Sequence, residues 1–118
     1  MSRVGCRFGE EYDYGTNQCK PMKEIPMELI KAKNKAEGGH FFDKDAMRFF
    51  NSRIEVKKAK VKGRKAFFVT SERFNETYPK KYTIHMMNLD TGRTDAQGEF
   101  QKYKSREEAL SDLKEITG

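Results

Sequence analysis

The chain has 118 residues, a formal net charge of +6 and 36% charged residues, which is typical of one small domain with a heavily solvated surface. No apolar run approaches the roughly 20 residues that a membrane-spanning helix needs, and the N-terminus lacks the apolar core of an export signal, so we expect a cytoplasmic protein. The basic balance favours acidic partners such as nucleic acid.

The first 24 residues show neither helical nor strand periodicity and contain both cysteines, Cys6 and Cys19. We predict that residues 1–24 form an irregular N-terminal arm or a small two-cysteine loop. A disulfide would close this loop in an oxidising compartment, whereas a cytoplasmic location favours two free thiols. The cysteine spacing fits no zinc signature and His40 and His85 are isolated, so we expect no metal site and no other cofactor.

Residues 25–39 are predicted to form a short helix followed by a Gly-Gly linker. Pro26 suits the first helical position, and "MELIKAKNKAE" consists of good helix formers until Gly38-Gly39. The slight apolar content of this helix indicates a place at the edge of the fold.

Residues 40–118 are predicted to form a single α+β domain that opens with a second helix, "FFDKDAMRFFNSR". Asp43 can cap this helix, while Phe42 and Met47 form a hydrophobic staple. Met47, Phe50 and Ile54 follow at helical spacing and predict its buried stripe.

A β-hairpin is predicted next, because "VKGRKA" places Gly63-Arg64 at the centre of a two-residue type II′ turn. The register then pairs Lys60 with Phe67. Alternation sends one set of side chains toward a core, namely Ala59, Val61, Ala66 and Phe68. The other set would face outward, namely Lys58, Lys60, Lys62, Lys65, Phe67 and Val69. Ile54 and Val56 are out of phase with this pattern, which predicts a bulge or bend near Lys57.

A second hairpin and a helix complete the pattern. "KYTIHMMN" directs Tyr82, Ile84 and Met86 to the core face, Gly92 suits the left-handed position of the turn, and "RTDAQGEF" is a weaker strand. Ala96, Gly98 and Phe100 share one face of that strand. In "SREEALSDLKEI", Ser105 and Glu108 stand in capping-box register, with Ala109, Leu113 and Ile116 as the buried stripe.

The predicted fold is therefore α+β, in the order α-α-β-β-β-β-α, with a four-stranded antiparallel sheet and all helices packed on one face. The opposite face is expected to be polar and basic at one end. It would carry the outward lysines together with Lys81, Thr83, His85, Arg93, Asp95 and Gln97.

The sequence predicts no enzyme. It lacks a phosphate-binding glycine loop and a nucleophile motif, and a general base at His85 has no partner that the sequence reveals.

The first hairpin is the candidate site, because residues 53–65 hold seven basic residues and one acid, a balance of +6 that equals the whole chain's net charge. We expect this segment to bind nucleic acid, mainly through phosphate, with Arg64 probing a groove and Phe67 stacking or wedging. About five neutralised phosphates would give a salt slope of about −4.5. The competing interpretation is that the lysines serve solubility and guard a strand edge. The cations expected to contact phosphate or flank it are Arg53, Lys57, Lys58, Lys60, Lys62 and Lys65.

Several motifs resemble known families. The FF-x-x-D-x-M-x-FF-N-S-R run from Phe41, "FVTSE", "KYTI" and G-E-F-Q-x-Y are similar to a family of small uncharacterised proteins of tailed bacteriophages, over residues 40–110. This resemblance implies a phage or prophage source and a stand-alone accessory protein. "GEF-x₄-SREEA", residues 98–109, resembles the last strand and helix of AP2-type DNA-binding domains, which implies a sheet that contacts DNA.

Two other functions stay open. One is a stoichiometric protein inhibitor of a host or defence complex, in which the basic face docks on an acidic or nucleic-acid-binding surface. The other is a virion or assembly component in which residues 1–39 contact a neighbouring subunit.

Overall fold

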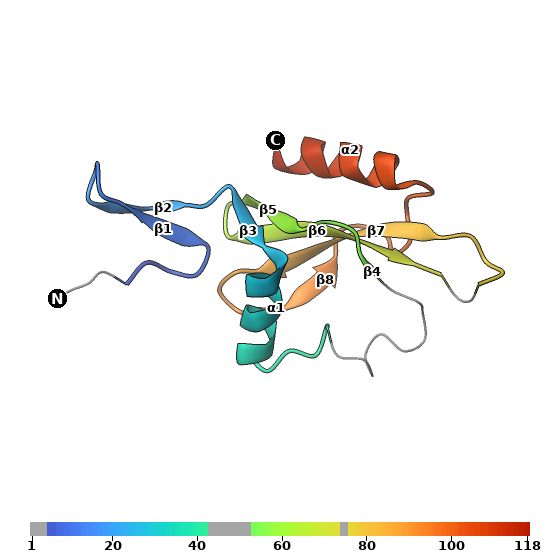
Figure 1. Ribbon diagram of the computed structural model, residues 1–118, viewed down its shortest axis with the longest axis horizontal. Helices are drawn as coiled ribbons and strands as arrows, with labels where there is room; N and C mark the ends of the chain where they lie inside the picture. Colours follow the sequence, from blue (N-terminus) through green and yellow to red (C-terminus); the bar gives the residue numbers. More distant parts are fainter. Residues whose placement is uncertain (1–4, 43–52, 74–75) are drawn as a thin grey trace.

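The protein is an α+β domain in which a mixed-length antiparallel sheet lies between two helices, as the computed structural model shows in Figure 1. The structure describes residues 5–42, 53–73 and 76–118. Within these residues the strands are β1 (Glu10–Asp13), β2 (Gln18–Pro21), β3 (Glu24–Pro26), β4 (Arg53–Ile54), β5 (Lys58–Lys62), β6 (Lys65–Glu72), β7 (Lys81–Asn88) and β8 (Thr94–Ala96). The helices are α1 (Met27–Ala36) and α2 (Arg106–Thr117).

The main sheet has six strands rather than the four that we predicted. Its order is β3-β5-β6-β7-β8, and β4 pairs with β6 beyond the end of β5. The two additional strands are β3 and β4, which are only three and two residues long and lack room for a visible alternation.

The predicted register of the β5–β6 hairpin is confirmed: Lys60 pairs with Phe67 and Lys62 with Lys65. Gly63 has a φ of +63°, the left-handed value that the turn requires. The bend near Lys57 is also present. Six residue steps separate Ile54 from Lys60, but only three separate their partners Thr70 and Phe67.

The sheet is covered on both faces, which corrects the prediction of helices on one face only (Figure 1). On one face α1 packs at the β3–β5 edge, where Ile25, Ile30 and Phe68 are fully or almost fully buried. On the other face α2 lays Ala109 and Leu113 on β6 and β7. Each helix therefore closes a core of its own.

The second hairpin meets the first with its faces reversed relative to our prediction. Phe68 pairs with His85 and Phe67 pairs with Met86, so Tyr82, Ile84 and Met86 lie under α2, whereas Ala66 and Phe68 face α1. The turn at Gly92 is confirmed by its φ of +73°. The following strand is shorter than predicted and ends at Ala96, which leaves Phe100 47% exposed in a loop.

The two helices whose predicted starts lie in the described residues are both present. The helix α1 begins at Met27, so Pro26 is its N-cap residue and not, as predicted, its first helical residue, and the helix ends before Gly38, whose φ is +81°. Ser105 caps α2 by accepting a hydrogen bond from the Glu108 amide at 3.1 Å. The helix predicted from Asp43 lies almost wholly outside the described residues, and Ile54, assigned to its stripe, belongs to β4.

The N-terminal segment forms its own small two-stranded sheet, which extends away from the main body (Figure 1). Cys6 and Cys19 are joined in a disulfide that clamps this β1–β2 hairpin, so of the two alternatives that the sequence left open the structure has the closed two-cysteine loop. Tyr14, at the tip, is 83% exposed. The sequence concealed this hairpin because its strands are short and mixed in polarity.

Candidate nucleic-acid interface

Four lysines line the outer part of the β5–β6 hairpin on the face that α2 partly covers. Lys58, Lys60 and Lys62 alternate along β5, Lys65 pairs with Lys62 across the turn, and all four side chains are exposed. We call these four residues the lysine row. The alternation places them on one face because successive strand side chains point to opposite sides.

Phe67 does not belong to an exposed surface, which corrects its assignment as a stacking residue. It shares the face of the lysine row, but it is only 5% exposed and packs in the α2 core with Val69 and Leu113. The last helix thus covers the apolar part of the predicted binding face and leaves the lysines at its margin.

Arg64 forms an ion pair with Asp90, so its guanidinium is not free to enter a nucleic-acid groove. Its Nε and Nη2 atoms donate to one oxygen of Asp90 at 3.1 and 2.7 Å. This contact lowers the pKa of Asp90, so the carboxylate stays ionised and the pair stays charged on both sides. A groove-probing role would require Arg64 to leave Asp90.

Two members of the lysine row also have partners within the protein. Lys60 forms an ion pair with Glu24 of β3, and Lys62 donates to the carbonyl of Ile116 at 3.0 Å near the C-terminal end of α2. A cation at this end of a helix complements the helix dipole. Arg53, Lys57, Lys58 and Lys65 are exposed and make no ion pair with any residue that the structure describes.

A second group of cations, which the sequence did not reveal, lies at the opposite end of the sheet. The segment that precedes α2 runs beside the start of β7, because the backbones of Tyr82 and Tyr103 exchange hydrogen bonds at 2.8 and 3.0 Å. This bridge brings Lys102 and Lys104 next to the start of β7. Other cations lie at the end of β6 and at the start of β7. We call the exposed or half-exposed cations at this end of the sheet the far-end cluster: Arg73, Lys80, Lys81, Lys102 and Lys104.

No linear signal identifies this cluster, since 21 positions separate Lys81 from Lys102 in the chain. The lysine row stood out because its cations are contiguous. The Lys-Tyr-Lys alternation of residues 102–104 could have indicated a short edge segment, but not the strand beside it.

Buried polar groups gather on the α1-side face of β6 and β7. Glu72 is 2% exposed and accepts hydrogen bonds from the hydroxyls of Thr70 and Thr83, the latter at 2.9 Å. His85 Nε2 lies 3.7 Å from Glu72, and the His85 ring contacts the rings of Phe41 and Phe68. Thr83 and His85, predicted on an exposed polar face, are therefore buried.

The Glu72–His85 pair supplies the partner that the sequence could not show for His85. His85 Nδ1 is buried and makes no hydrogen bond with the described residues. The two side chains are only 7% and 3% exposed, so this pair is enclosed and cannot contact a macromolecule at the surface.

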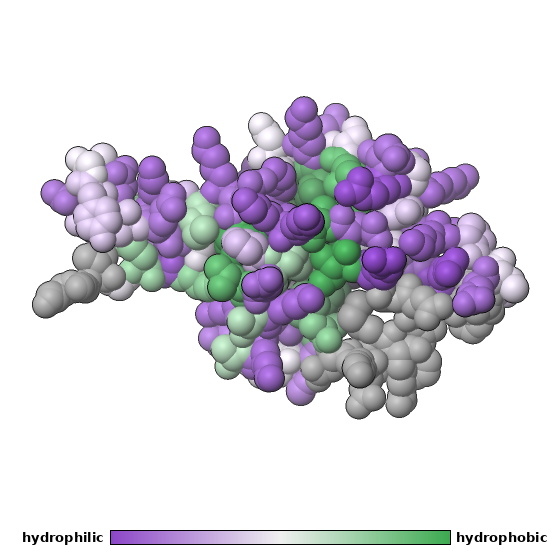
Figure 2. All heavy atoms as spheres, viewed as in Figure 1, coloured by the Kyte–Doolittle hydropathy of each residue, from purple (hydrophilic) through white to green (hydrophobic). Residues whose placement is uncertain are grey.

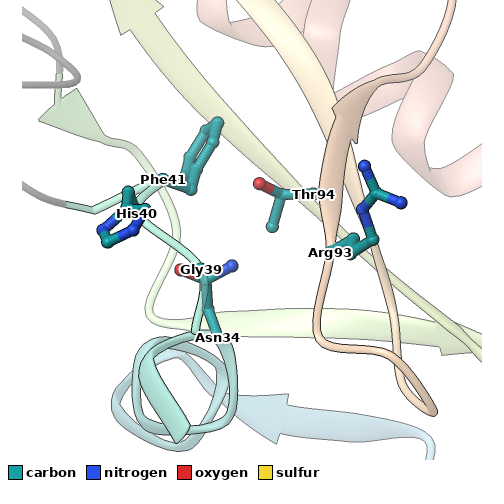
Figure 3. A pocket seen from close by; sticks show the side chains of 6 residues that line it. All are labelled: Asn34, Gly39, His40, Phe41, Arg93 and Thr94. Atoms are coloured by element: carbon teal, nitrogen blue, oxygen red, sulfur yellow. The ribbon is translucent and has the colours of Figure 1, made fainter. Parts of the chain in front are cut away.

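A hollow of about 290 Å³ lies between the end of α1 and the start of β8 (Figure 3). Asn34 belongs to its wall, but its amide already donates to the Gly92 carbonyl at 2.7 Å. Figure 3 shows the guanidinium of Arg93 pointing away from Phe41 and His40 across the opening. The hollow therefore offers mainly apolar and backbone surface.

Within the described ranges, no three His, Cys, Asp or Glu side chains stand close enough together to hold a metal ion. Nor does any helix there have the length and apolar character to cross a membrane.

Fold and surface together define a small α+β sheet protein with cationic groups at both ends of its central β6–β7 hairpin. The profile of a family of unknown function, DUF7447, matches residues 26–114, well over half of the chain, so the protein belongs to this family. The β1–β2 hairpin precedes the matched residues. No curated protein and no solved structure matches the chain.

Proposed function

We propose that this protein is a small phage-type accessory protein that binds nucleic acid, mainly through the phosphate backbone, at its β5–β6 hairpin. The observation that supports the proposal is the lysine row: four exposed lysines on one face of one hairpin, in a segment that carries a charge equal to the chain's whole net charge. Lysine ammonium groups contact phosphate as point charges and read no base pattern. Sequence-independent binding is therefore expected.

The internal partners of Arg64, Lys60 and Lys62 reduce the number of phosphates that the hairpin can neutralise. Lys57, Lys58 and Lys65 make no ion pair with a described residue that would have to break before they contact a ligand. Three contacts to duplex DNA correspond to a slope of about −2.7 in the logarithm of affinity against the logarithm of salt. This is shallower than the five-phosphate slope that the charge count alone implies.

The proposal is tested by salt titration of a fluorescent duplex with a matched pair of variants. The double variant Lys58→Gln/Lys65→Gln removes two charges from the hairpin, whereas Lys31→Gln/Lys35→Gln removes two exposed charges from α1. We expect the first to lower the slope to about −0.9 and the second to leave it unchanged. Equal losses in both variants, or binding that is insensitive to salt, would contradict the proposal.

A protein partner is the second candidate function, and the β1–β2 hairpin is the observation that favours it. This hairpin is clamped by a disulfide, extends from the body and presents Tyr14 with 83% exposure at its tip. Tyrosine is enriched at interaction hot spots, and a covalent clamp reduces the ordering cost of binding. A protein complex formed through this hairpin would survive nuclease treatment and weaken in Tyr14→Ala, whereas an inhibitor that docks its basic face would weaken in Lys58→Gln/Lys65→Gln instead.

A further inference from the structure

The far-end cluster gathers five cations at the start of β7 from three separate parts of the chain. Lys81 lies opposite Glu72 in the β6–β7 register. The Tyr82–Tyr103 bridge places Lys102 and Lys104 along the other edge of β7. Arg73 and Lys80 belong to the two ends of the β6–β7 connection. These charges come together only because the chain returns to β7 just before α2.

The acids of β6 and of the adjoining loops do not cancel the cluster. Glu76 and Glu99 lie in the adjoining loops, and Glu72 is turned into the protein, where the hydroxyls of Thr70 and Thr83 solvate it. Five positive charges minus these three negative charges leave +2, before Glu108 and Asp112 of α2, whose charges act on Tyr103, are counted. The exposed cations therefore outnumber the acids of the adjoining strand and loops, and Figure 2 shows hydrophilic side chains dominating this end.

Exposed aromatic rings accompany these cations, which distinguishes this end from the lysine row. Tyr78, in the β6–β7 loop, is 53% exposed, and Phe100, in the loop after β8, is 47% exposed. The backbone N–H of Gln101 donates a hydrogen bond to the Thr83 hydroxyl oxygen at 2.7 Å. This bond holds the loop that carries Phe100 against β7. By contrast, Phe67 beside the lysine row is covered by α2.

Cations beside exposed aromatic rings suit a single strand better than a duplex. The bases of a single strand are free to stack on aromatic side chains while lysines follow the backbone, whereas the bases of a duplex are occupied with one another. The lysine row has cations without an exposed ring and has no such preference. The two ends of the β6–β7 hairpin thus differ in the chemistry that they offer.

We infer that the far-end cluster is a second binding site, which takes single-stranded nucleic acid by stacking a base on Tyr78 and holding phosphates with Lys81, Lys102 and Lys104. This inference rests on the proposed function and adds the substrate class. Lys65, at the turn end of the lysine row, lies seven residue steps or about 23 Å from Glu72 along β6, and Lys60, opposite Phe67, lies two steps nearer. A short oligonucleotide can therefore occupy one site without the other.

The experiment compares a fluorescent oligothymidine of about four nucleotides, short enough to occupy one site, with a 12-base-pair duplex on the full chain. Tyr78→Ala should weaken the oligothymidine about 5- to 150-fold, the range that corresponds to stacking of one base, and should change duplex affinity less than about twofold. Tyr78→Phe keeps the ring and should retain wild-type affinity. Because Tyr78 is exposed, circular dichroism of both variants should match that of the wild type.

Charge removal supplies an independent test. Lys81→Gln/Lys102→Gln should weaken the oligothymidine more than the duplex, and Lys58→Gln/Lys65→Gln should do the reverse. If Tyr78→Ala and Lys81→Gln/Lys102→Gln change neither probe while the hairpin variant weakens the duplex, the inference is wrong and the proposed function stands. If the wild-type protein binds neither probe, both fail together.

Discussion

The substitution Phe67→Ala distinguishes two roles for this residue, one in the protein core and one in the binding interface. The sequence places this ring on the binding face beside the lysines, whereas in the structure it is 5% exposed beneath α2. An interface role predicts lost binding with little change in stability. A core role predicts the opposite.

The expected cost follows from the packing around the ring. Phe67 belongs to a buried group that includes Val69, Ile84 and Leu113, so its truncation would leave a cavity beneath α2. Truncation of a buried phenylalanine to alanine costs about 3–5 kcal/mol, which is a large share of the roughly 5–15 kcal/mol that stabilises a typical domain. With a urea m-value of about 1.5 kcal/mol/M, the unfolding midpoint should fall by about 2–3 M.

Equilibrium urea unfolding, followed by circular dichroism, measures this shift. Lys65→Ala, an exposed neighbour on the same strand, is the control and should stay within about 0.5 kcal/mol of the wild type. Phe67→Leu keeps an apolar side chain, so it should stay folded for the binding assay and bind the duplex like the wild type. An unchanged midpoint for Phe67→Ala together with weakened binding would refute the burial of this ring beneath α2.

Three further outcomes follow from individual contacts. Ser105→Ala removes the N-cap bond of α2 and should cost about 0.5–2 kcal/mol in urea unfolding, whereas Ser105→Asp should retain most of the stability. Cys6→Ser/Cys19→Ser opens a loop whose closure contributes about 3 kcal/mol, so amide exchange should accelerate in residues 10–21 and stay slow in β6; slow exchange in the hairpin would contradict this role. Burial and the 2.8 Å hydrogen bond to Asp112 raise the pKa of Tyr103 to about 12, above the ordinary value of 10. A raised folded pKa favours the neutral phenol, so its contribution to stability is complete below pH 10 and is lost between pH 10 and 12; tyrosinate absorbance should show one late-titrating group that Tyr103→Phe removes.

Local signals in the sequence predicted the elements that depend on local chemistry. Gly63 fixed a two-residue turn, and that turn set the pairing of Lys60 with Phe67. Ser105 with Glu108 marked the start of α2. These predictions hold because a turn glycine and a helix cap act within four residues, so no distant partner can reverse them.

The relation between hairpins could not be predicted in the same way. Whether Ile84 shares a face with Phe68 or with Phe67 depends on the length and path of the β6–β7 loop, and a shift of one residue exchanges the faces. The position of α2 is equally nonlocal, because its stripe of Ala109 and Leu113 fits either face of an apolar strand. The family match does not help with either point, because the description of the family gives neither a function nor a fold.

One signal for the two-sided sheet was nevertheless present in β6. Its sequence "AFFVT" runs from Ala66 to Thr70 without polar alternation, and all five residues are buried. An uninterrupted apolar strand is typical of a strand covered on both faces, whereas a sheet with one wet face alternates. Once both faces of β6 are covered, its own exposed lysine, Lys65, can lie only at its end. The lysine row on the β5–β6 hairpin and the far-end cluster beside β7 therefore flank the same covered strand, and nucleic acid bound at either proposed site would lie beside that strand rather than on the flat of the sheet.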